Sequence, residues 1–372
     1  MTALADDIAQ LQRCVTNRLN PAMLGTAHLV GVIGDRPSAY SKSPDLWNAV
    51  FHALRMDVAY IPLDVDESRL SDLISVMRSS SRFLGANVTV PYKIKIVRCL
   101  DRLEEKTKPI KAVNTIVRSS AGELLGCNTD GQGFLVSVLD VLPGQNGPFL
   151  PRLNGVDVLL IGAGGAARAV AFALAEVLDT GKLVICNRAR ERAQDLAQDL
   201  QKVFRHVIPI GESDIDTWAP KVGLIINSSV KGQEGLRRTA AGKITILEPY
   251  SALAPADPAA FSEVESSAPD FSERWLKASA HDIENNNRIS LQLARRVPAH
   301  VACYDLIYAP AETVFLRHAR LTGHRIQNGK AMIIAQAAEA LFHNIARPML
   351  ETNGNYTPEV YRRVLDLMFT AW

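Results

Sequence analysis

The sequence lacks the features that define several specialised protein classes. It contains no run of 18 consecutive apolar residues, so a membrane-spanning helix is not expected. The first 20 residues carry early acids and no apolar stretch, which argues against a secretory signal peptide. The eight histidines form no HExxH pattern, and the five cysteines are odd in number without a CxxC pair, so no metal site or disulfide framework is predicted. This use of cysteine indicates a cytoplasmic protein whose thiols pack as small apolar groups.

An excess of charge of one sign is also absent. Lys and Arg number 41 against 39 Asp and Glu, which leaves a net charge of +2. This balance gives no general electrostatic reason for binding nucleic acid or an anionic membrane. Hydrophobic residues make up 47% of the 372 residues, so the chain can form a sizeable core and its length suggests two or three domains. Composition does not distinguish a monomer from a homodimer, because core faces and contact faces look alike in sequence.

The first part of the chain alternates predicted strands and helices. Short apolar runs rich in β-branched residues predict strands at 29–34, 59–65 and 83–90. The spacing of apolar residues predicts helices at 44–56 and 67–79 between them. This alternation is typical of a βαβ layout, so the predicted fold class is α/β.

A second alternating series follows a Pro-, Gly- and Asn-rich connection at 143–155, which indicates a nearby domain boundary. The segment 156–178 combines an apolar strand, a Gly-rich turn and an Ala-rich helix. Further strands are predicted at 182–188 and 222–229, with a helix between them that extends to about residue 202.

The remaining segments are less regular. Helical spacing occurs at 5–20, and 300–308 resembles another strand. Residues 236–300 look mostly irregular, with one helix predicted around 284–296. The last 40 residues are predicted to be helical.

The Gly-rich turn reads GxGxxA and lies between a predicted strand and a predicted helix. The first glycine permits a tight turn, the second lets a pyrophosphate approach the backbone, and the small third residue permits helix–strand contact. The helix N-terminus would then face the phosphates. The alternative is an α/β turn that needs glycines only for its own geometry. The predicted dinucleotide-binding residues are Gly162, Ala163, Gly164, Gly165 and Ala166.

The end of the next strand distinguishes NADP from NAD. NAD sites usually place an acid there to bind the ribose 2′-hydroxyl, whereas this chain has Asn187 followed by Arg188 and, shortly after, Arg192. A 2′-phosphate suits the planar guanidinium group, so NADP is predicted ahead of NAD. The alternative is that these arginines belong to a solvated helix start.

Eight ordered motifs resemble the shikimate dehydrogenase family, which includes quinate/shikimate dehydrogenases. The resemblance covers roughly 28–235 and 300–345. The upstream motifs are VIGDRPSAYSKSPDLWNAVF (32–51), GANVTVPYK (85–93), KAVNTIV (111–117) and GELLGCNTDGQGF (122–134). The later motifs are NRARERAQDLA (187–197), LIINSSVKG (224–232), DLIYAPAETVFL (305–316) and GKAMIIAQAAEALF (329–342).

The resemblance implies a catalytic pair, Lys93 and Asp130. A protonated lysine beside a reacting carbonyl oxygen can supply charge stabilisation and a proton, and a nearby aspartate keeps the ammonium oriented. Without the matching motifs, Lys93 would be interpreted as a surface lysine and Asp130 as a helix cap.

The resemblance also implies residues that face the substrate and the cofactor. Ser41 and Ser43 would bind a carboxylate, although they also suit helix capping. The other substrate residues would be Asn87, Thr89, Asn114, Tyr308 and Gln336. Asn87 and Asn114 could instead be loop amides that satisfy backbone groups. Tyr308 could be an ordinary aromatic at a strand end, and Gln336 could make an interhelical polar contact. The further cofactor residues would be Asn227, Ser228 and Gly329.

Several positions depart from the family's pattern. Ala189 stands where a threonine is common, which removes one contact to a 2′-phosphate, and Val230 and Gln233 alter the segment near the nicotinamide. The segment 236–300 is identified as an insertion that could be a lid, an oligomer contact or plain surface.

These observations predict a two-domain α/β protein. An N-terminal α/β substrate domain (1–130) would be completed by C-terminal helices (330–372), and a Rossmann-type doubly wound NADP-binding domain would span 131–329. The resemblance implies NADPH-dependent reversible reduction of 3-dehydroshikimate to shikimate in aromatic amino acid biosynthesis. The same resemblance implies that Ser43, in place of threonine, favours shikimate over the bulkier quinate. The alternatives are a dehydrogenase for quinate or another cyclic polyol and, more remotely, a non-catalytic sensor of a metabolite or dinucleotide.

Overall fold

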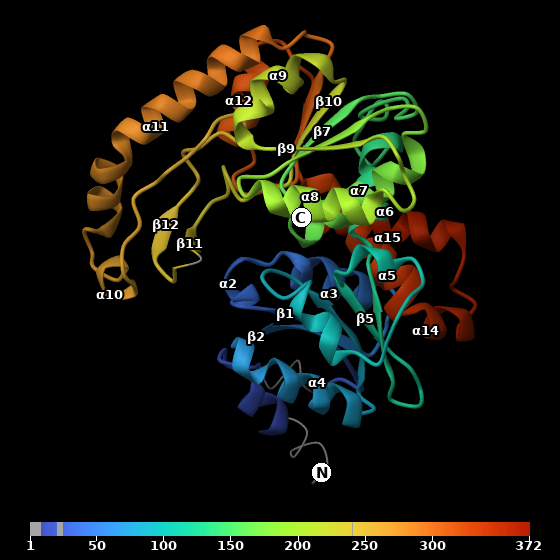
Figure 1. Cartoon of the computed structure of the whole chain (residues 1–372). Helices are drawn as coiled ribbons and strands as arrows, with labels where there is room; N and C mark the ends of the chain where they lie inside the picture. Colours follow the sequence, from blue (N-terminus) through green and yellow to red (C-terminus); the bar gives the residue numbers. More distant parts are fainter. Residues whose placement is uncertain (1–8, 21–24, 240) are drawn as a thin grey trace. The chain divides into compact units, whose positions relative to one another are not determined.

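The computed structural model describes residues 9–20, 25–239 and 241–372. The chain forms two compact units, each built on a six-stranded sheet with helices packed on it, so the predicted α/β class is confirmed (Figure 1). The first unit contains Met1–Pro148, Arg168–Val170 and Ala331–Trp372. The second contains Phe149–Ala167 and Ala171–Lys330.

The sheet of the first unit is mixed. The strand β1 pairs parallel with β2 and β3, whereas β5 pairs antiparallel with β3 and β6. The β5–β6 hairpin was not predicted, because its turn depends on Gly122 at φ +87° and its strands have only four residues each. The spatial order is β2 (Val58–Asp64), β1 (His28–Gly34), β3 (Phe83–Val88), β5 (Thr115–Arg118), β6 (Leu124–Cys127) and β4 (Arg102–Leu103).

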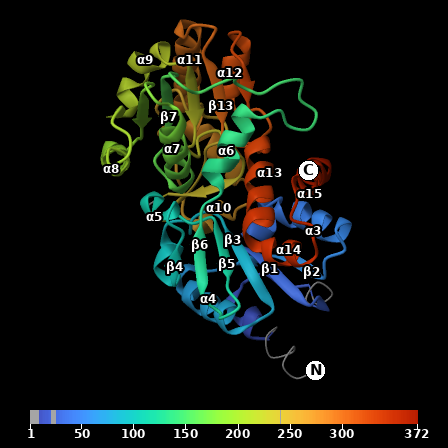
Figure 2. The same ribbon diagram turned by 90° about the vertical axis from the view of Figure 1, so that its right-hand side faces the viewer.

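Helices cover both faces of this first sheet (Figure 2). One core includes α4 (Leu70–Ser79) and the N-terminal segment, of which residues 9–14 are helical and residues 5–8 lie outside the described range. The other core contains α3 (Ser43–Ala53), where a proline at the second helical position fits the missing N–H of a first turn. The C-terminal helices that complete it are α13 (Lys330–Glu339), the π-helical residues 340–345, α14 (Arg347–Thr352) and α15 (Pro358–Ala371).

The sheet of the second unit is entirely parallel. Its strands run in the order β14 (Ile326–Gln327), β13 (Ala302–Asp305), β10 (Leu224–Asn227), β7 (Val158–Ile161), β8 (Leu183–Cys186) and β9 (Val207–Ile210). The order reverses between β7 and β10, which is the doubly wound pattern with its switch point at the end of β7. The strand ends are in register, because Ile161 lies opposite both Cys186 and Asn227, and Asn227 lies opposite Asp305.

The segment 236–300 is more ordered than predicted. It contains a hairpin of β11 (Leu236–Arg238) and β12 (Ile244–Ile246), the short α10 (Glu263–Ser266), and α11 (Phe271–Arg296) beside the hairpin (Figure 1). The prediction of a helix only at 284–296 was too short, because α11 buries polar residues that hide its apolar period. In the missed part, for example, Ser279 is buried and its hydroxyl accepts from the Ala259 N–H at 3.1 Å.

Candidate active site

The topology of the first unit brings three separate sequence motifs together at the ends of three adjacent strands, β3, β5 and β6. In the paired register, Asn87 lies opposite Thr115, and Thr115 lies opposite Cys127. The residues that follow or precede these positions therefore meet, although they are far apart in sequence. Asn87, Asn114 and the Asn128–Asp130 turn form one polar cluster for this reason.

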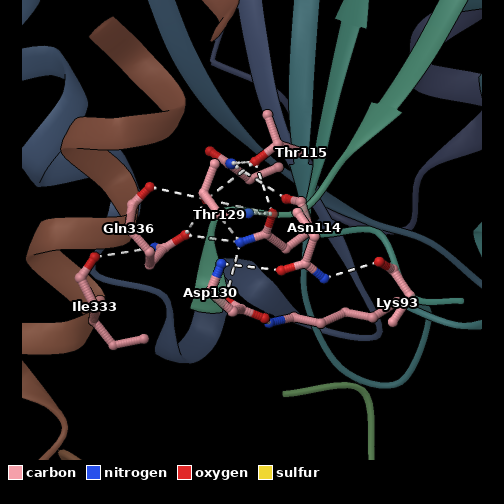
Figure 3. A network of polar contacts seen from close by, with 10 residues as sticks. Lys93, Asn114, Thr115, Thr129, Asp130, Ile333 and Gln336 are labelled. Atoms are coloured by element: carbon pink, nitrogen blue, oxygen red, sulfur yellow. Dashed lines mark hydrogen bonds and ion pairs between the residues drawn. The ribbon is translucent and has the colours of Figure 1, made fainter. Parts of the chain in front are cut away.

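Lys93 and Asp130 form a close ion pair within this cluster (Figure 3). The Lys93 Nζ atom lies 2.5 Å from Asp130 Oδ2, and the two side chains are 18% and 4% exposed. Asp130 is the first residue of α6 (Asp130–Leu139), and its backbone N–H donates to Asn128 Oδ1 at 3.0 Å. The aspartate is thus fixed by the chain that follows β6, and the lysine ammonium remains partly accessible beside it.

Asn114 connects this ion pair to the C-terminal helix α13. Its Nδ2 lies 2.9 Å from Asp130 Oδ1 and 3.1 Å from Gln336 Oε1, and its Oδ1 accepts from the Thr129 N–H at 2.8 Å (Figure 3). Both Asn114 and Gln336 are buried. Of the predicted substrate residues, Asn114 therefore contacts Asp130 of the catalytic pair directly, and Gln336 is connected to it through Asn114.

Gly133 permits the close approach of α6 to α13. A Cβ atom at this position would lie 2.6 Å from the backbone nitrogen of Gln336 and 2.7 Å from its Cα. Such distances are far below van der Waals contact, so only glycine fits here without displacement of α13. The residue thereby sets the position of Gln336 relative to Asn114.

Tyr60 is a member of the cluster that the sequence interpretation missed. Its buried hydroxyl donates to Asn87 Oδ1 at 2.7 Å and hydrogen bonds with Ser43, and burial raises its pKa. Asn87 in turn donates through Nδ2 to Thr115 Oγ1 at 3.2 Å. The available signal was a tyrosine in an otherwise apolar strand, since a buried phenol requires a hydrogen-bond partner.

The remaining predicted substrate residues lie in two places. Ser41 Oγ accepts from the Ser43 N–H at 3.2 Å just before α3, whose N-cap residue is Lys42 and has no side-chain cap bond. Thr89 is half-buried and follows β3, where its methyl group lies 2.6 Å from the position of a Cβ at Gly34. Tyr308 belongs to the second unit, where burial raises its pKa and nearby Arg237 opposes that shift.

The glycine-rich turn of the second unit lies at the switch point. Gly162 follows β7 with φ +121°, and a Cβ there would come within 2.6 Å of the Ser228 hydroxyl. Gly164 is exposed, has no atom within 4 Å of a built Cβ, and precedes α7 (Gly165–Val177). Ala163, Gly165 and Ala166 are half-buried in the same turn. A tight turn, an open glycine and a helix N-terminus fit the pyrophosphate of a dinucleotide.

The predicted 2′-phosphate residues follow the next strand, β8. Asn187 is half-buried and donates to the Ala189 carbonyl at 2.9 Å at the start of α8 (Arg190–Leu200). Arg188 and Arg192 are exposed and form no ion pair among the described residues, whereas Arg190 lies 3.9 Å from Asp214. Two guanidinium groups without an acidic partner among the described residues therefore lie shortly after β8.

Asn227 and Asp305 form a second buried network at the ends of β10 and β13. Asn227 Nδ2 donates to Asp305 Oδ1 at 3.0 Å and to the Lys231 carbonyl, so the amide is engaged within the protein. Asp305 also accepts from Thr313 Oγ1 and the Ile307 N–H, and burial raises its pKa to about 7. The sequence interpretation missed this aspartate, although it stands at a strand end.

Two other predicted cofactor residues lie beside this network. Ser228 donates through its hydroxyl to the Ile161 carbonyl at 2.9 Å. Gly329 donates to the Ile307 carbonyl, and a Cβ there would lie 2.0 Å from the Leu306 oxygen. Both therefore fix the loops that follow β7 and β13.

The described residues contain no cluster of three or more His, Cys, Asp or Glu side chains arranged to hold a metal ion. No described helix combines the length and apolar character needed to cross a membrane. A cavity of about 430 Å³ lies in the second unit between α11 and the loop after β13, but its lining includes none of the predicted site residues.

The chain is similar to known proteins over most of its length. Residues 32–116 match the model of the shikimate dehydrogenase substrate binding domain, and 148–244 match that of shikimate / quinate 5-dehydrogenase. A shikimate dehydrogenase (NADP(+)) of Carboxydothermus hydrogenoformans is 34% identical over 85% of this chain and 91% of its own, and one of Symbiobacterium thermophilum is 32% identical over 84% and 87%. The Thermus thermophilus shikimate 5-dehydrogenase solved with NADP(H) and shikimate has a TM-score of 0.60 at 26% identity, covering 92% of this chain and 99% of its own. On this evidence, the chain belongs to the shikimate dehydrogenase family.

Proposed function

We propose that this protein is an NADP-dependent shikimate dehydrogenase that reversibly reduces 3-dehydroshikimate to shikimate, as a step of aromatic amino acid biosynthesis in the cytoplasm. The observation that carries the proposal is the Lys93–Asp130 pair, held by Asn114 within 3 Å. An ordinary surface lysine would not be paired with a buried aspartate that is itself held by Asn114 and Asn128. This arrangement suits proton transfer to and from the carbonyl or hydroxyl oxygen carried by the ring of the substrate.

Lys93 is the proton donor in the direction of reduction. When bound by the second unit, NADPH would supply the hydride that reduces the carbonyl carbon of the substrate. The carbonyl oxygen then takes up the Lys93 proton and becomes the hydroxyl of shikimate. Asp130 would keep the ammonium oriented towards this oxygen, because its carboxylate lies 2.5 Å from Nζ. In the direction of oxidation, neutral Lys93 accepts the same hydroxyl proton.

The other predicted substrate residues supply the partners that a hydroxylated carboxylic acid needs. Ser41 and Ser43 would donate to the carboxylate, and the cluster of Asn87, Asn114 and Gln336 would orient the ring hydroxyls. These groups are already bonded to one another, so little side-chain freedom remains to be lost on binding. Thr89 and Tyr308 complete the predicted set.

The second unit would bind NADP. The open Gly164 at the start of α7 suits the pyrophosphate, and Arg188 and Arg192 suit a 2′-phosphate because they have no acidic partner among the described residues. Asn227 and Ser228 would act through the loops that they fix, since their side chains are bonded to protein groups.

The test is turnover of purified protein, followed by absorbance of the reduced nicotinamide. Shikimate and quinate are each combined with NADP and with NAD. We expect fast turnover with shikimate and NADP. Preference for quinate would support the polyol alternative, and calorimetric binding of shikimate without turnover in any combination would support the sensor alternative.

A further inference from the structure

Asp64 at the end of β2 anchors the short helix α2 (Pro37–Tyr40). Its Oδ1 accepts from the Ser38 N–H at 2.9 Å, and its Oδ2 accepts from the Ser38 hydroxyl at 2.5 Å. The carboxylate is buried, and no described Lys or Arg forms an ion pair with it. The residue before α2, Arg36, provides no side-chain cap. The carboxylate from the neighbouring strand therefore takes the place of a cap.

The helix α2 leads directly into the serines predicted to bind the substrate carboxylate. Ser41 ends the helix and donates its N–H to the Pro37 carbonyl at 2.9 Å, and Ser41 Oγ accepts from the Ser43 N–H. A helix of four residues is not stable by itself. The position of the two hydroxyl groups consequently depends on what holds the start of α2.

The N-terminal segment holds Asp64 from the other side. Asn17 Oδ1 accepts from the Asp64 N–H at 2.9 Å, and Asn17 Nδ2 donates to the Pro62 carbonyl at 3.0 Å. The Thr16 N–H donates to the Asp64 carbonyl at 2.8 Å. Because β2 is the edge strand of the sheet, these bonds satisfy backbone groups that would otherwise face solvent.

The segment is also fixed by apolar packing. Its residues Leu11, Cys14, Val15 and Leu19 are buried in the core that contains α4. This packing places Asn17 beside β2, where its two side-chain bonds form. The segment is thus part of the first unit and not a loose tail.

We propose that Asp64 is a positioning residue for the substrate carboxylate, and that residues 9–20 brace it. The chain of contacts runs from Asn17 through the backbone and carboxylate of Asp64 to Ser38, and along α2 to Ser41 and Ser43. The ligand at the end of this chain is a small carboxylic acid. The inference rests on the proposed function, because it assigns Asp64 to the shikimate-binding serines.

The test is steady-state kinetics with shikimate and NADP for Asp64→Asn and Ser38→Ala. Ser38→Ala removes the hydroxyl bond, whereas Asp64→Asn keeps an oxygen that can accept from the Ser38 N–H but removes the carboxylate charge and the acceptor of the hydroxyl bond. We expect the KM for shikimate to rise about five- to tenfold in Asp64→Asn and about threefold in Ser38→Ala. The kcat and the KM for NADP should stay within about twofold of wild type, because neither bond touches the Lys93 pair or the second unit. The exposed Asp66→Asn is the matched control and should leave all three constants unchanged.

Asn17→Ala tests the brace, with the exposed neighbour Arg18→Ala as control. Asn17→Ala should raise the KM for shikimate by about threefold, and Arg18→Ala should not.

An unchanged KM for shikimate in Asp64→Asn, or a parallel rise in the KM for NADP, would overturn the inference. If Asp64→Asn fails to fold, Ser38→Ala decides, because Ser38 is an exposed residue and the change removes only its hydroxyl bond to Asp64. A wild-type protein that does not turn over shikimate would contradict the proposed function as well, whereas an active wild type with unaffected variants would contradict this inference alone.

Discussion

The polar side chains predicted to bind ligands differ between the two units: those of the first are hydrogen bonded to other protein groups, and the charged ones of the second are not, within the described part of the chain. In the first unit, Asn114, Asp130 and Gln336 are buried and bonded to one another. In the second, Arg188 and Arg192 are exposed and form no ion pair among the described residues. The first arrangement is preorganised for chemistry, whereas the second is open for a charged ligand. Substitutions in the first should therefore affect kcat or folding, and substitutions in the second should affect cofactor affinity.

The largest effect is expected for Lys93→Met. This change removes the proposed proton donor and leaves Asp130 buried without its cation, so kcat should fall about a thousandfold. Lys95→Met is the matched control, because Lys95 is exposed and pairs with exposed Glu67. Steady-state kinetics of both variants provides the measurement. Near-wild-type turnover of Lys93→Met would contradict the proposed mechanism.

Gly133→Ala tests whether the first unit depends on close packing. The added methyl group would collide with the backbone of Gln336, so we expect a loss of about 1–3 kcal/mol in the free energy of unfolding. Displacement of Gln336 should also raise the KM for shikimate. Gly147→Ala is the control, since a Cβ there meets no atom within 4 Å. Equal unfolding free energies for the two variants, measured by denaturant titration, would refute the packing argument.

Arg188→Ala tests the open side of the comparison. Loss of one guanidinium–phosphate contact should raise the KM for NADP about tenfold and leave that for NAD unchanged. The Tm should not change, because Arg188 is exposed. Arg190→Ala serves as the control, since this side chain lies near Asp214. A parallel rise in both KM values would show that Arg188 does not recognise the 2′-phosphate.

Asp305 sharpens the comparison, because its carboxyl group is hydrogen bonded within the second unit. Burial raises its pKa from 3.8 to about 7, so the folded protein binds this proton more tightly than the unfolded chain. Its contribution to stability is therefore present below about pH 4 and is lost as the pH rises towards 7. Asp305→Asn stays neutral, so its Tm relative to wild type should increase with pH across this window, by up to about 3 °C per pH unit. Parallel Tm curves between pH 4.5 and 8 would contradict this assignment.

The sequence was most informative where one local pattern determines one element. The strand, Gly-rich turn and helix predicted over 156–178 appear as β7 and α7, and the predicted helices at 44–56 and 67–79 are present within a few residues. Apolar periodicity and turn glycines act within a few residues, so they can be read directly. The prediction of an α/β fold depended on these patterns alone.

The missed features depend on contacts between distant residues. The helix α11 begins earlier than predicted, and its missed part contains buried Ser279, whose hydroxyl accepts from the Ala259 N–H, a partner that nothing near Ser279 in sequence indicates. Tyr60 joins the substrate cluster only because β2 and β3 flank β1. Lys93 and Asp130 could be paired from family motifs, but the role of Asn114 between Asp130 and Gln336 required the fold.

The central claim is that Lys93 and Asp130 act as one unit. The most direct measurement is a double-mutant cycle on kcat for shikimate oxidation, with Lys93→Met, Asp130→Asn and the double variant. Groups that act together are not additive, so the double variant should lose little more activity than Lys93→Met alone. Losses that multiply, so that the double variant falls by the product of the two single effects, would show independent roles and contradict the claim.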